Sequence, residues 1–128
     1  MTCYIATALD VSFEAAVARV EATLKDEGFG VLTRIDVRET MKAKLDKDFR
    51  PYVILGACNP TFAYEALPLE DKVGTMLPCN VVVQQPFPGK IEVAAVDPVA
   101  SMQAIDNPRL KEAAQAVREK LARVIASL

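Results

Sequence analysis

Two cysteine–asparagine pairs, Cys58-Asn59 and Cys79-Asn80, are the residues of this sequence best suited to chemistry. Each pair falls at the end or the start of a predicted strand, where functional residues gather on turns held by a rigid scaffold. Cys58 directly precedes a predicted helix, whose dipole and free N–H groups would stabilise a thiolate. The pattern predicts a thiol site in which Cys58 is the reactive group and Cys79 is its neighbour or resolving partner.

The same residues also have a purely structural interpretation. Free cysteine is among the most buried residue types, so Cys58 and Cys79 are more typical of small core residues than of reactive thiols. Pro60 after Asn59 favours a helix N-cap followed by proline at the first helical position. Gly56 would let a ligand or another backbone come close to its strand, or it would satisfy packing against a helix. Both interpretations stay open for the candidate ligand or thiol site, which consists of Gly56, Cys58, Asn59, Cys79 and Asn80.

Several kinds of catalytic site are excluded by the residue types present. Histidine is absent, which excludes every catalytic or metal-binding arrangement that needs an imidazole. The cysteines, of which Cys3 is the third, do not form the closely spaced pairs of a zinc site. The glycine-rich motifs G-x-G-x-x-G and G-x-x-x-x-G-K, which cradle phosphates, do not occur. We therefore expect no metal, no cofactor and no catalytic residue that can be named.

The composition is that of one globular domain. Of the 128 residues, 52% are hydrophobic and 25% are charged, and a chain of this length holds one core, so we expect a single domain over residues 1–128. The net charge of −2 gives no electrostatic reason to expect a nucleic acid or an anionic membrane as partner. The N-terminal residues do not resemble a signal peptide, and three cysteines are too few for a disulfide framework. We therefore expect a cytoplasmic protein.

Hydrophobic periodicity predicts an α+β domain with the order β-α-β-α-β-α-β-β-α. The predicted strands cover residues 3–9, 30–35, 52–58, 81–85 and 90–96, and the predicted helices cover residues 12–27, 36–46, 59–67 and 107–127. For the helix at 36–46 there is an alternative, in which residues 33–40 continue the second strand. Residues 86–89 are short enough for a hairpin, which makes the sheet at least partly antiparallel. The two long helices each carry one apolar stripe, so we expect them to pack side by side on one face of the sheet.

The opposite face of the predicted sheet needs its own cover. The strand at residues 52–58 is apolar at every position, which is typical of a strand that is covered on both faces. The two long helices cover only one face, so the short helices or a second subunit must cover the other. Without a cover, the apolar patch would exceed the few hundred Å² that is usual for a monomer. We therefore expect a symmetric homodimer.

The last predicted helix shows which residues should form the core. The helical spacing places Val117 and Leu121 on its apolar stripe and leaves Arg118 and Lys120 on the exposed side.

Two motifs resemble those of the domain of unknown function 302 family of small prokaryotic proteins: Val53-Ile54-Leu55-Gly56-Ala57-Cys58-Asn59-Pro60 and Leu77-Pro78-Cys79-Asn80-Val81-Val82-Val83. The stretches 28–36 and 95–98 match the family as well. The resemblance covers nearly the whole chain. It implies a curved, mainly antiparallel sheet with two long helices on one face, similar in topology to half of a TATA-binding protein, and an assembly as dimers. It does not extend to DNA binding, because the isoelectric point is near 5.2 and no basic saddle is present.

The family resemblance implies a fold but no established reaction, so the function is argued from the residues alone. We expect a homodimeric, non-catalytic binding or interaction module, with a small molecule as its candidate ligand. The alternative is a thiol-based redox or sulfur-handling protein that uses Cys58 and Cys79. The two hypotheses differ in whether these two cysteines share one pocket that solvent can reach.

Overall fold

The computed structural model describes residues 2–128. Its strands and helices follow the expected order, β-α-β-α-β-α-β-β-α, with a 3-10 helix, η1, and a four-residue helix, α4, added between them. The elements are β1 (Tyr4–Leu9), α1 (Phe13–Asp26), β2 (Gly30–Asp36), α2 (Val37–Leu45), β3 (Tyr52–Cys58), α3 (Pro60–Leu69), η1 (Val73–Met76), β4 (Cys79–Phe87), β5 (Lys90–Val96), α4 (Pro98–Ser101) and α5 (Pro108–Ala126).

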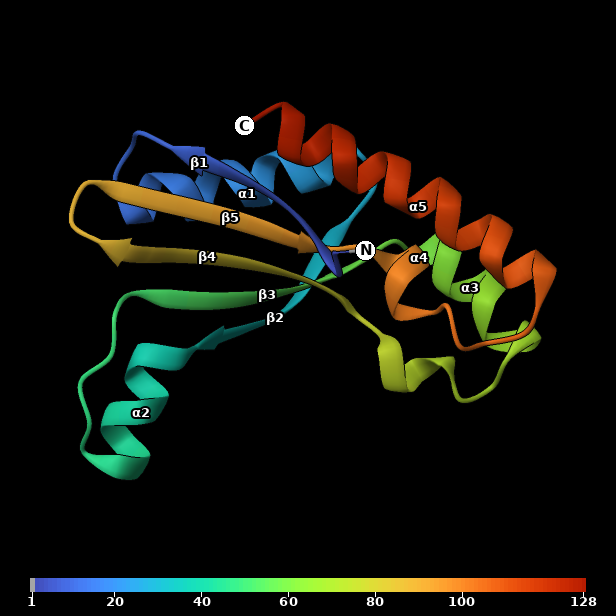
Figure 1. The fold of residues 1–128 in the computed structure, drawn as a ribbon, viewed down its shortest axis with the longest axis horizontal. Helices are drawn as coiled ribbons and strands as arrows, with labels where there is room; N and C mark the ends of the chain where they lie inside the picture. The colour runs from blue at the N-terminus through green and yellow to red at the C-terminus, as the bar shows by residue number, and fades with distance from the viewer. Residues whose placement is uncertain (1) are drawn as a thin grey trace.

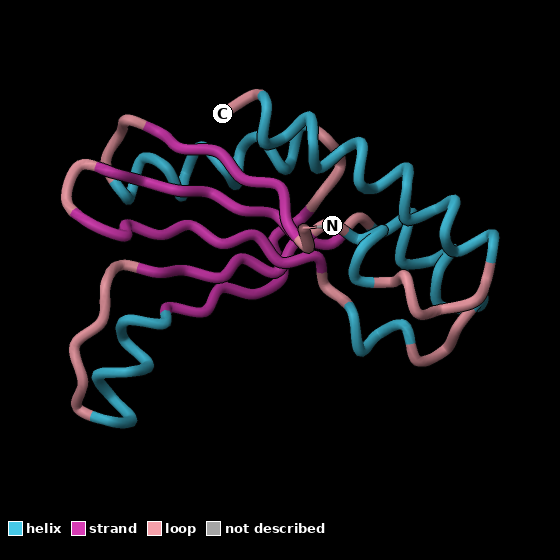
Figure 2. Tube along the Cα trace, viewed as in Figure 1, coloured by secondary structure: helices cyan, strands magenta, loops and turns pink. Residues whose placement is uncertain are grey.

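The strands form one sheet in the order β1-β5-β4-β3-β2, and every neighbouring pair is antiparallel. This confirms the expected α+β class. Figure 1 and Figure 2 show that the sheet is twisted, so that β1 and β2 at its two edges run in clearly different directions. The strands β4 and β5 form a hairpin around Gly89, whose φ of 86° is a backbone conformation that glycine adopts easily.

The two long helices begin at side chains that cap them. The Ser12 hydroxyl accepts a hydrogen bond from the backbone N–H of Ala15 at 3.2 Å, at the start of α1. The Asn107 side chain accepts hydrogen bonds from the N–H groups of Arg109 and Leu110 at the start of α5. Each side chain satisfies N–H groups that have no partner inside their helix, which explains why the two long helices begin where they do.

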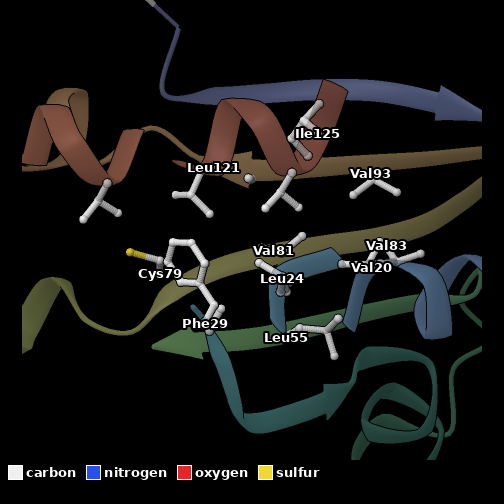
Figure 3. Packing of buried hydrophobic residues seen from close by; sticks show 14 of the residues in the cluster. Val20, Leu24, Phe29, Leu55, Cys79, Val81, Val83, Val93, Leu121 and Ile125 are labelled. Atoms are coloured by element: carbon white, nitrogen blue, oxygen red, sulfur yellow. The ribbon is translucent and has the colours of Figure 1, made fainter. Parts of the chain in front are cut away.

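The core lies between the sheet and the two long helices, α1 and α5. Both helices contact the sheet and each other on one side, as expected. The sheet contributes the inward positions of its central strands, and the helices contribute one stripe each (Figure 3). The fully buried side chains include Val20, Leu24, Leu55, Val81, Val83, Val93, Leu110, Leu121 and Val124. Val117 is also buried, so the predicted phase of the last helix is confirmed.

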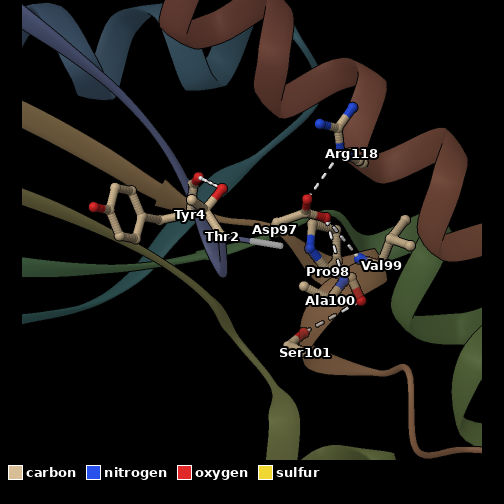
Figure 4. A network of polar contacts seen from close by, with 8 residues as sticks. All are labelled: Thr2, Tyr4, Asp97, Pro98, Val99, Ala100, Ser101 and Arg118. Atoms are coloured by element: carbon tan, nitrogen blue, oxygen red, sulfur yellow. Dashed lines mark hydrogen bonds and ion pairs between the residues drawn. The ribbon is translucent and has the colours of Figure 1, made fainter.

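The polar side of α5 is less exposed than the sequence predicts. Arg118 and Lys120 are half-buried rather than exposed. Arg118 reaches back to the carboxylate of Asp97, which precedes α4, with an Nε–Oδ2 distance of 2.9 Å (Figure 4). Helical spacing alone does not reveal this contact, because the two residues are 21 positions apart.

Two prolines lie inside elements that they were expected to bound. Pro68 lies in the last turn of α3, which ends one residue later at Leu69. Pro86 lies within β4, which extends to Phe87 instead of ending near residue 85. The register between β4 and β5 shifts between Gln84 and Phe87, so the missing N–H of Pro86 falls at an irregular position of the ladder, where proline is tolerated.

The short helices do not cover the second side of the central strands. The helices α3 and α4 pack on α5, while α2 contacts β2 and β3 at one edge and buries none of its own residues. Figure 1 shows α2 projecting from the β2 edge of the sheet. Within residues 2–128, the side of β4 and β5 opposite to α1 and α5 is therefore free of helices, and we call it the open face.

Candidate functional site

The thiol of Cys79 lies on the helix side of the sheet. Cys79 pairs with Ala57 of β3, is 4% exposed, and lies close to Phe29 in the core (Figure 3). Burial raises the pKa of the Cys79 thiol to about 11, and a charge on Cys58 raises it further. Cys79 is therefore a neutral thiol at neutral pH, without the depressed pKa that a nucleophilic cysteine needs.

Cys58 lies close to Cys79 but in a different environment. It is the last residue of β3 and is half-buried. Because successive side chains of a strand point to opposite sides, Cys58 alternates with the inward-facing Ala57. Ala57 pairs with Cys79 across β3 and β4, so Cys58 and Cys79 are adjacent in the sheet, but their side chains leave it on opposite sides. Cys3, the third cysteine, is exposed near the start of β1.

The side chain of Asn59 caps the start of helix α3. Its Oδ1 accepts a hydrogen bond from the backbone N–H of Phe62 at 3.1 Å, and the residue is 8% exposed. Its amide nitrogen lies close to Gly28, which ends α1 with a φ of 87°. No buried polar side-chain atom within residues 2–128 lacks a hydrogen-bond partner. The side chain of Asn59 therefore stabilises the start of α3.

Gly56 is enclosed by side chains of the same chain. A Cβ atom at this position would collide with the Thr33 hydroxyl on β2 and would lie 2.8 Å from Cγ of Pro78. Thr33 is the residue paired with Gly56 across the two strands. The close approach that the glycine permits is thus made by Thr33 and Pro78, and no helix is involved.

The open face carries an apolar row that crosses every strand of the sheet. The register aligns one outward-facing residue from each strand, in the order Ala6, Ala94, Val82, Ile54 and Ile35. In β3, β4 and β5 these residues alternate with buried inward positions, so their side chains point away from α1 and α5. Ile35, at one end of the row, is 48% exposed. We call this set the apolar row.

A polar row lies beside the apolar row, one pleat further along the strands. It aligns Glu92, Gln84 and Tyr52 across β5, β4 and β3. The Gln84 amide donates a hydrogen bond to Oε1 of Glu92 at 2.9 Å. Arg50, just before β3, donates from Nε to Oε1 of Gln84 at 2.8 Å. An anion and a cation therefore stand on opposite sides of β4, joined through one amide.

Aromatic rings hold the cation of this row in place. The guanidinium carbon of Arg50 lies 4.5 Å from the ring centroid of Phe49 and 5.5 Å from that of Tyr52. Contacts of this kind are cation–π interactions, which restrict the orientation of the planar guanidinium. Arg50 is otherwise exposed, so its remaining N–H groups are accessible to a partner.

A shallow hollow of about 400 Å³ lies over the two rows. Tyr4, which is 52% exposed, and Tyr52 line it together with Val82, Ala94 and Glu92. Asn80 lines it as well and is exposed. Of the five candidate residues, the structure thus places Asn80 on the open face and Gly56 beneath Thr33 and Pro78. Cys79 and Asn59 are buried, and Cys58 is half-buried at the end of β3.

Sequence reasoning missed the residues that give the open face its chemistry, namely Tyr4, Arg50, Tyr52, Gln84 and Glu92. A signal for two of them is present, because Gln84 and Glu92 alternate with buried apolar residues in their strands. Arg50 lies outside any element, so periodicity carries no information about it.

A larger groove, of about 720 Å³, lies between α3 and α5. It is lined by exposed residues such as Tyr64 and Glu112, so no polar group is buried there to orient a ligand. Within residues 2–128, no three potential ligands of the types His, Cys, Asp and Glu gather in a way that could hold a metal ion. None of the helices in the same range has the length and apolar character to cross a bilayer.

Comparisons with known proteins agree with this fold. The sequence profile described as "Domain of unknown function DUF302" matches residues 5–128. The structure is similar to the crystal structure of an uncharacterized conserved protein DUF302 from Bacillus stearothermophilus, with a TM-score of 0.90, 32% sequence identity and 98% of each chain covered. No functionally curated protein matches the sequence. These descriptions assign no activity, ligand or partner.

Proposed function

The chain belongs to the DUF302 family, as its motifs indicate, and we propose that it is a non-catalytic binding domain that works as a homodimer through its open face. The observation that carries this proposal is the apolar row, which crosses all strands of the sheet and which, within residues 2–128, no helix covers over β4 and β5.

The chemistry of the open face supports a protein partner with a similar flat surface. Two sheets that pack face to face bury their facing side chains about 10 Å apart, as in a sandwich core. A row of alanine, valine and isoleucine has the size and polarity of such a core. A symmetric dimer needs one surface that is complementary to itself, and a single row that spans the whole sheet meets this requirement.

The state of the candidate thiol site supports the non-catalytic part of the proposal. The raised pKa of Cys79 keeps its thiol neutral at neutral pH. Asn59 is a helix cap, and the space above Gly56 is filled by the chain itself. The motif residues therefore stabilise the junction of β3, β4 and α3.

Light scattering at tens of micromolar protein tests the proposed homodimer. The wild-type chain should have twice the monomer mass of 13.9 kDa. Ile54→Asp introduces a charge into the apolar row next to its central residue and should give the monomer mass, whereas Lys111→Asp on the exposed side of α5 should leave the dimer intact. Circular dichroism establishes that both variants are folded. A wild-type mass near 13.9 kDa contradicts the proposal.

Thiol chemistry at Cys58 is the second candidate function. The observation in its favour is that Cys58 is only half-buried at the end of β3, next to Ala57, which pairs with Cys79. A reactive Cys58 should be alkylated by iodoacetamide in the native protein at neutral pH, well before Cys79. If mass spectrometry finds Cys58 unlabelled until the protein is unfolded, this candidate is excluded, and the binding domain remains.

A further inference from the structure

We propose that the two copies of the homodimer are related by a two-fold axis parallel to β4 that passes over Val82. In this arrangement β3 of each copy lies over β5 of the other. The inference rests on the proposed homodimer and adds to it the pairs of residues that meet. Three independent features of the open face support it: the sizes of the apolar side chains, the positions of the charges and the place of the hollow.

Side-chain size changes systematically along the apolar row. On one side of Val82 the row contains alanines, Ala94 and Ala6, and on the other side it contains isoleucines, Ile54 and Ile35. Rotation about an axis along β4 exchanges the two sides. Each isoleucine then lies over an alanine of the second copy, and Val82 lies over its own counterpart. Large side chains that face small ones fill the space between two layers at the density of a protein interior.

The alternative two-fold axis, which runs across the strands along the apolar row, produces a poor fit. Every residue of the row would then face its own copy. Isoleucine would face isoleucine at one end of the row, and alanine would face alanine at the other. Isoleucine against isoleucine overpacks the interface, and alanine against alanine leaves a cavity, so both ends of the row would weaken the contact.

The charges of the polar row follow the same two-fold symmetry. Arg50 stands on the β3 side of β4 and Glu92 stands on the β5 side, and each is hydrogen-bonded to Gln84 between them. Rotation about the axis along β4 brings Arg50 of each copy over Glu92 of the other. Arg50 uses only Nε in its bond to Gln84, and Glu92 uses only Oε1, so each has capacity for a further charged partner. Two ion pairs of this kind determine the register of an interface.

The hollow on the open face lies where the second copy would need space. Val82 and Ala94 are among the residues that line it. In the proposed dimer, the side chain of Ile54 from the second copy enters above Ala94, and Tyr4 and Tyr52 border the apolar contact. The hollow is therefore part of the interface and is filled by the second copy.

Charge reversal in two separate chains tests the axis. Arg50→Glu brings a second carboxylate opposite Glu92 of the other copy, and Glu92→Arg brings a second guanidinium opposite Arg50. Sedimentation should therefore show that each variant alone dimerises at least tenfold more weakly than the wild type. An equimolar mixture should form a heterodimer, because in the mixed pair every facing position carries opposite charges. If Arg50 and Glu92 acted only within their own chains, mixing the two variants would not restore dimer formation.

The outcomes of this experiment separate the inference from the proposed function. If the wild type is dimeric and the single variants are dimeric as well, the proposed axis is wrong but the homodimer stands. The same conclusion follows if the wild type is dimeric and the mixture of the two variants stays monomeric. If the wild type is a monomer, the axis and the homodimer are both wrong, and a small molecule becomes the candidate ligand of the hollow. The pair Lys111→Glu and Glu112→Lys on α5 serves as the matched control and should change nothing, since both residues are exposed on the opposite side of the molecule.

Cross-linking measures the geometry independently of the charges. In a chain with Cys3→Ser and Cys58→Ser, Val82→Cys should be joined to its own copy by a short bismaleimide, because it lies on the axis. Ile54→Cys alone should give little product, whereas Ile54→Cys mixed with Ala94→Cys should give the covalent dimer. Efficient cross-linking of Ile54→Cys to itself would overturn the axis along β4 and favour the axis across the strands.

Discussion

Arg118 of α5 donates a hydrogen bond from Nε to Oδ2 of Asp97 at 2.9 Å, and the other oxygen of the same carboxylate caps α4 (Figure 4). Oδ1 accepts from the backbone N–H of Val99 at 3.0 Å and from that of Ala100 at 3.4 Å. The backbone N–H of Asp97 donates to the carbonyl of Cys3 at 2.8 Å. One residue thus joins the start of β1, the short helix α4 and the long helix α5.

Loss of Arg118 should destabilise the protein. Asp97 is nearly buried, so Arg118→Ala leaves a carboxylate with its backbone partners but without its counter-charge. We expect a decrease of about 1–3 kcal/mol in the free energy of unfolding, measured by urea denaturation. Lys111→Ala on the exposed side of the same helix is the control and should change stability by less than about 0.5 kcal/mol. Equal effects of the two substitutions would show that the Asp97 contact contributes nothing.

Substitutions in the core stripe of α5 should have a larger effect. Leu121 is fully buried between α5 and the sheet, so Leu121→Ala removes apolar contacts and leaves a cavity. We expect a loss of about 2–5 kcal/mol. Lys120→Ala removes a half-buried side chain that keeps its charge in water, and it should cost well under about 1 kcal/mol. Denaturation of both variants under one set of conditions measures the difference, and similar losses would contradict the observed packing of α5.

The fold was predictable from the sequence where local patterns determine it. The caps at Ser12 and Asn107 and the apolar stripe of α5 are local patterns, and the structure contains each of them. The contact between Arg118 and Asp97 is not local, because it depends on the position of α4 after β5. The same reason explains why the sequence did not predict the burial of Arg118.

Gly56 provides a test of the crowding at the junction of β2, β3 and β4. Gly56→Ala places a methyl group against the Thr33 hydroxyl and 2.8 Å from Cγ of Pro78. We expect a loss of about 1–3 kcal/mol in the free energy of unfolding. Thr33→Ala removes the hydroxyl, so in the double variant part of this loss should be recovered.

Gly74 in η1 is the matched control for Gly56. No atom lies within 4 Å of a Cβ built at Gly74, so Gly74→Ala should be neutral or slightly stabilising. If Gly56→Ala is tolerated as well as Gly74→Ala, the junction adapts to an additional methyl group. The two substitutions are compared by thermal or urea unfolding at one protein concentration.

The candidate site was predicted only in part, for a reason that concerns the direction of side chains. The motif residues Cys58 and Cys79 were correctly placed at strand ends, and the pairing of Ala57 with Cys79 makes them adjacent in the sheet. Whether such a residue faces the core or the open face depends on strand register, and a shift of one residue reverses it. Arg50 and Glu92 are brought into one row only by the pairing of β3, β4 and β5, which no short motif encodes.

Burial of Cys79 determines how stability depends on alkaline pH. The folded protein holds the thiol proton more tightly than the unfolded chain does, because burial raises the pKa of Cys79 from 9.0 to about 11. Below pH 9 the thiol is protonated in both states, so its contribution to stability is fully present. Between pH 9 and pH 11 the unfolded chain loses the proton first, which favours unfolding.

Cys79→Ala should therefore remove a pH-dependent loss of stability. The wild-type protein should lose about 2–3 kcal/mol more than this variant between about pH 8.5 and pH 11, since one pKa unit corresponds to about 1.4 kcal/mol. The substitution also costs stability at every pH because it leaves a small cavity, so the slope against pH is the quantity to compare. Urea denaturation at several pH values measures it. Cys3→Ala, at an exposed thiol, is the control and should retain the wild-type slope. Parallel curves for the wild type and Cys79→Ala would mean that solvent reaches Cys79 in the native state.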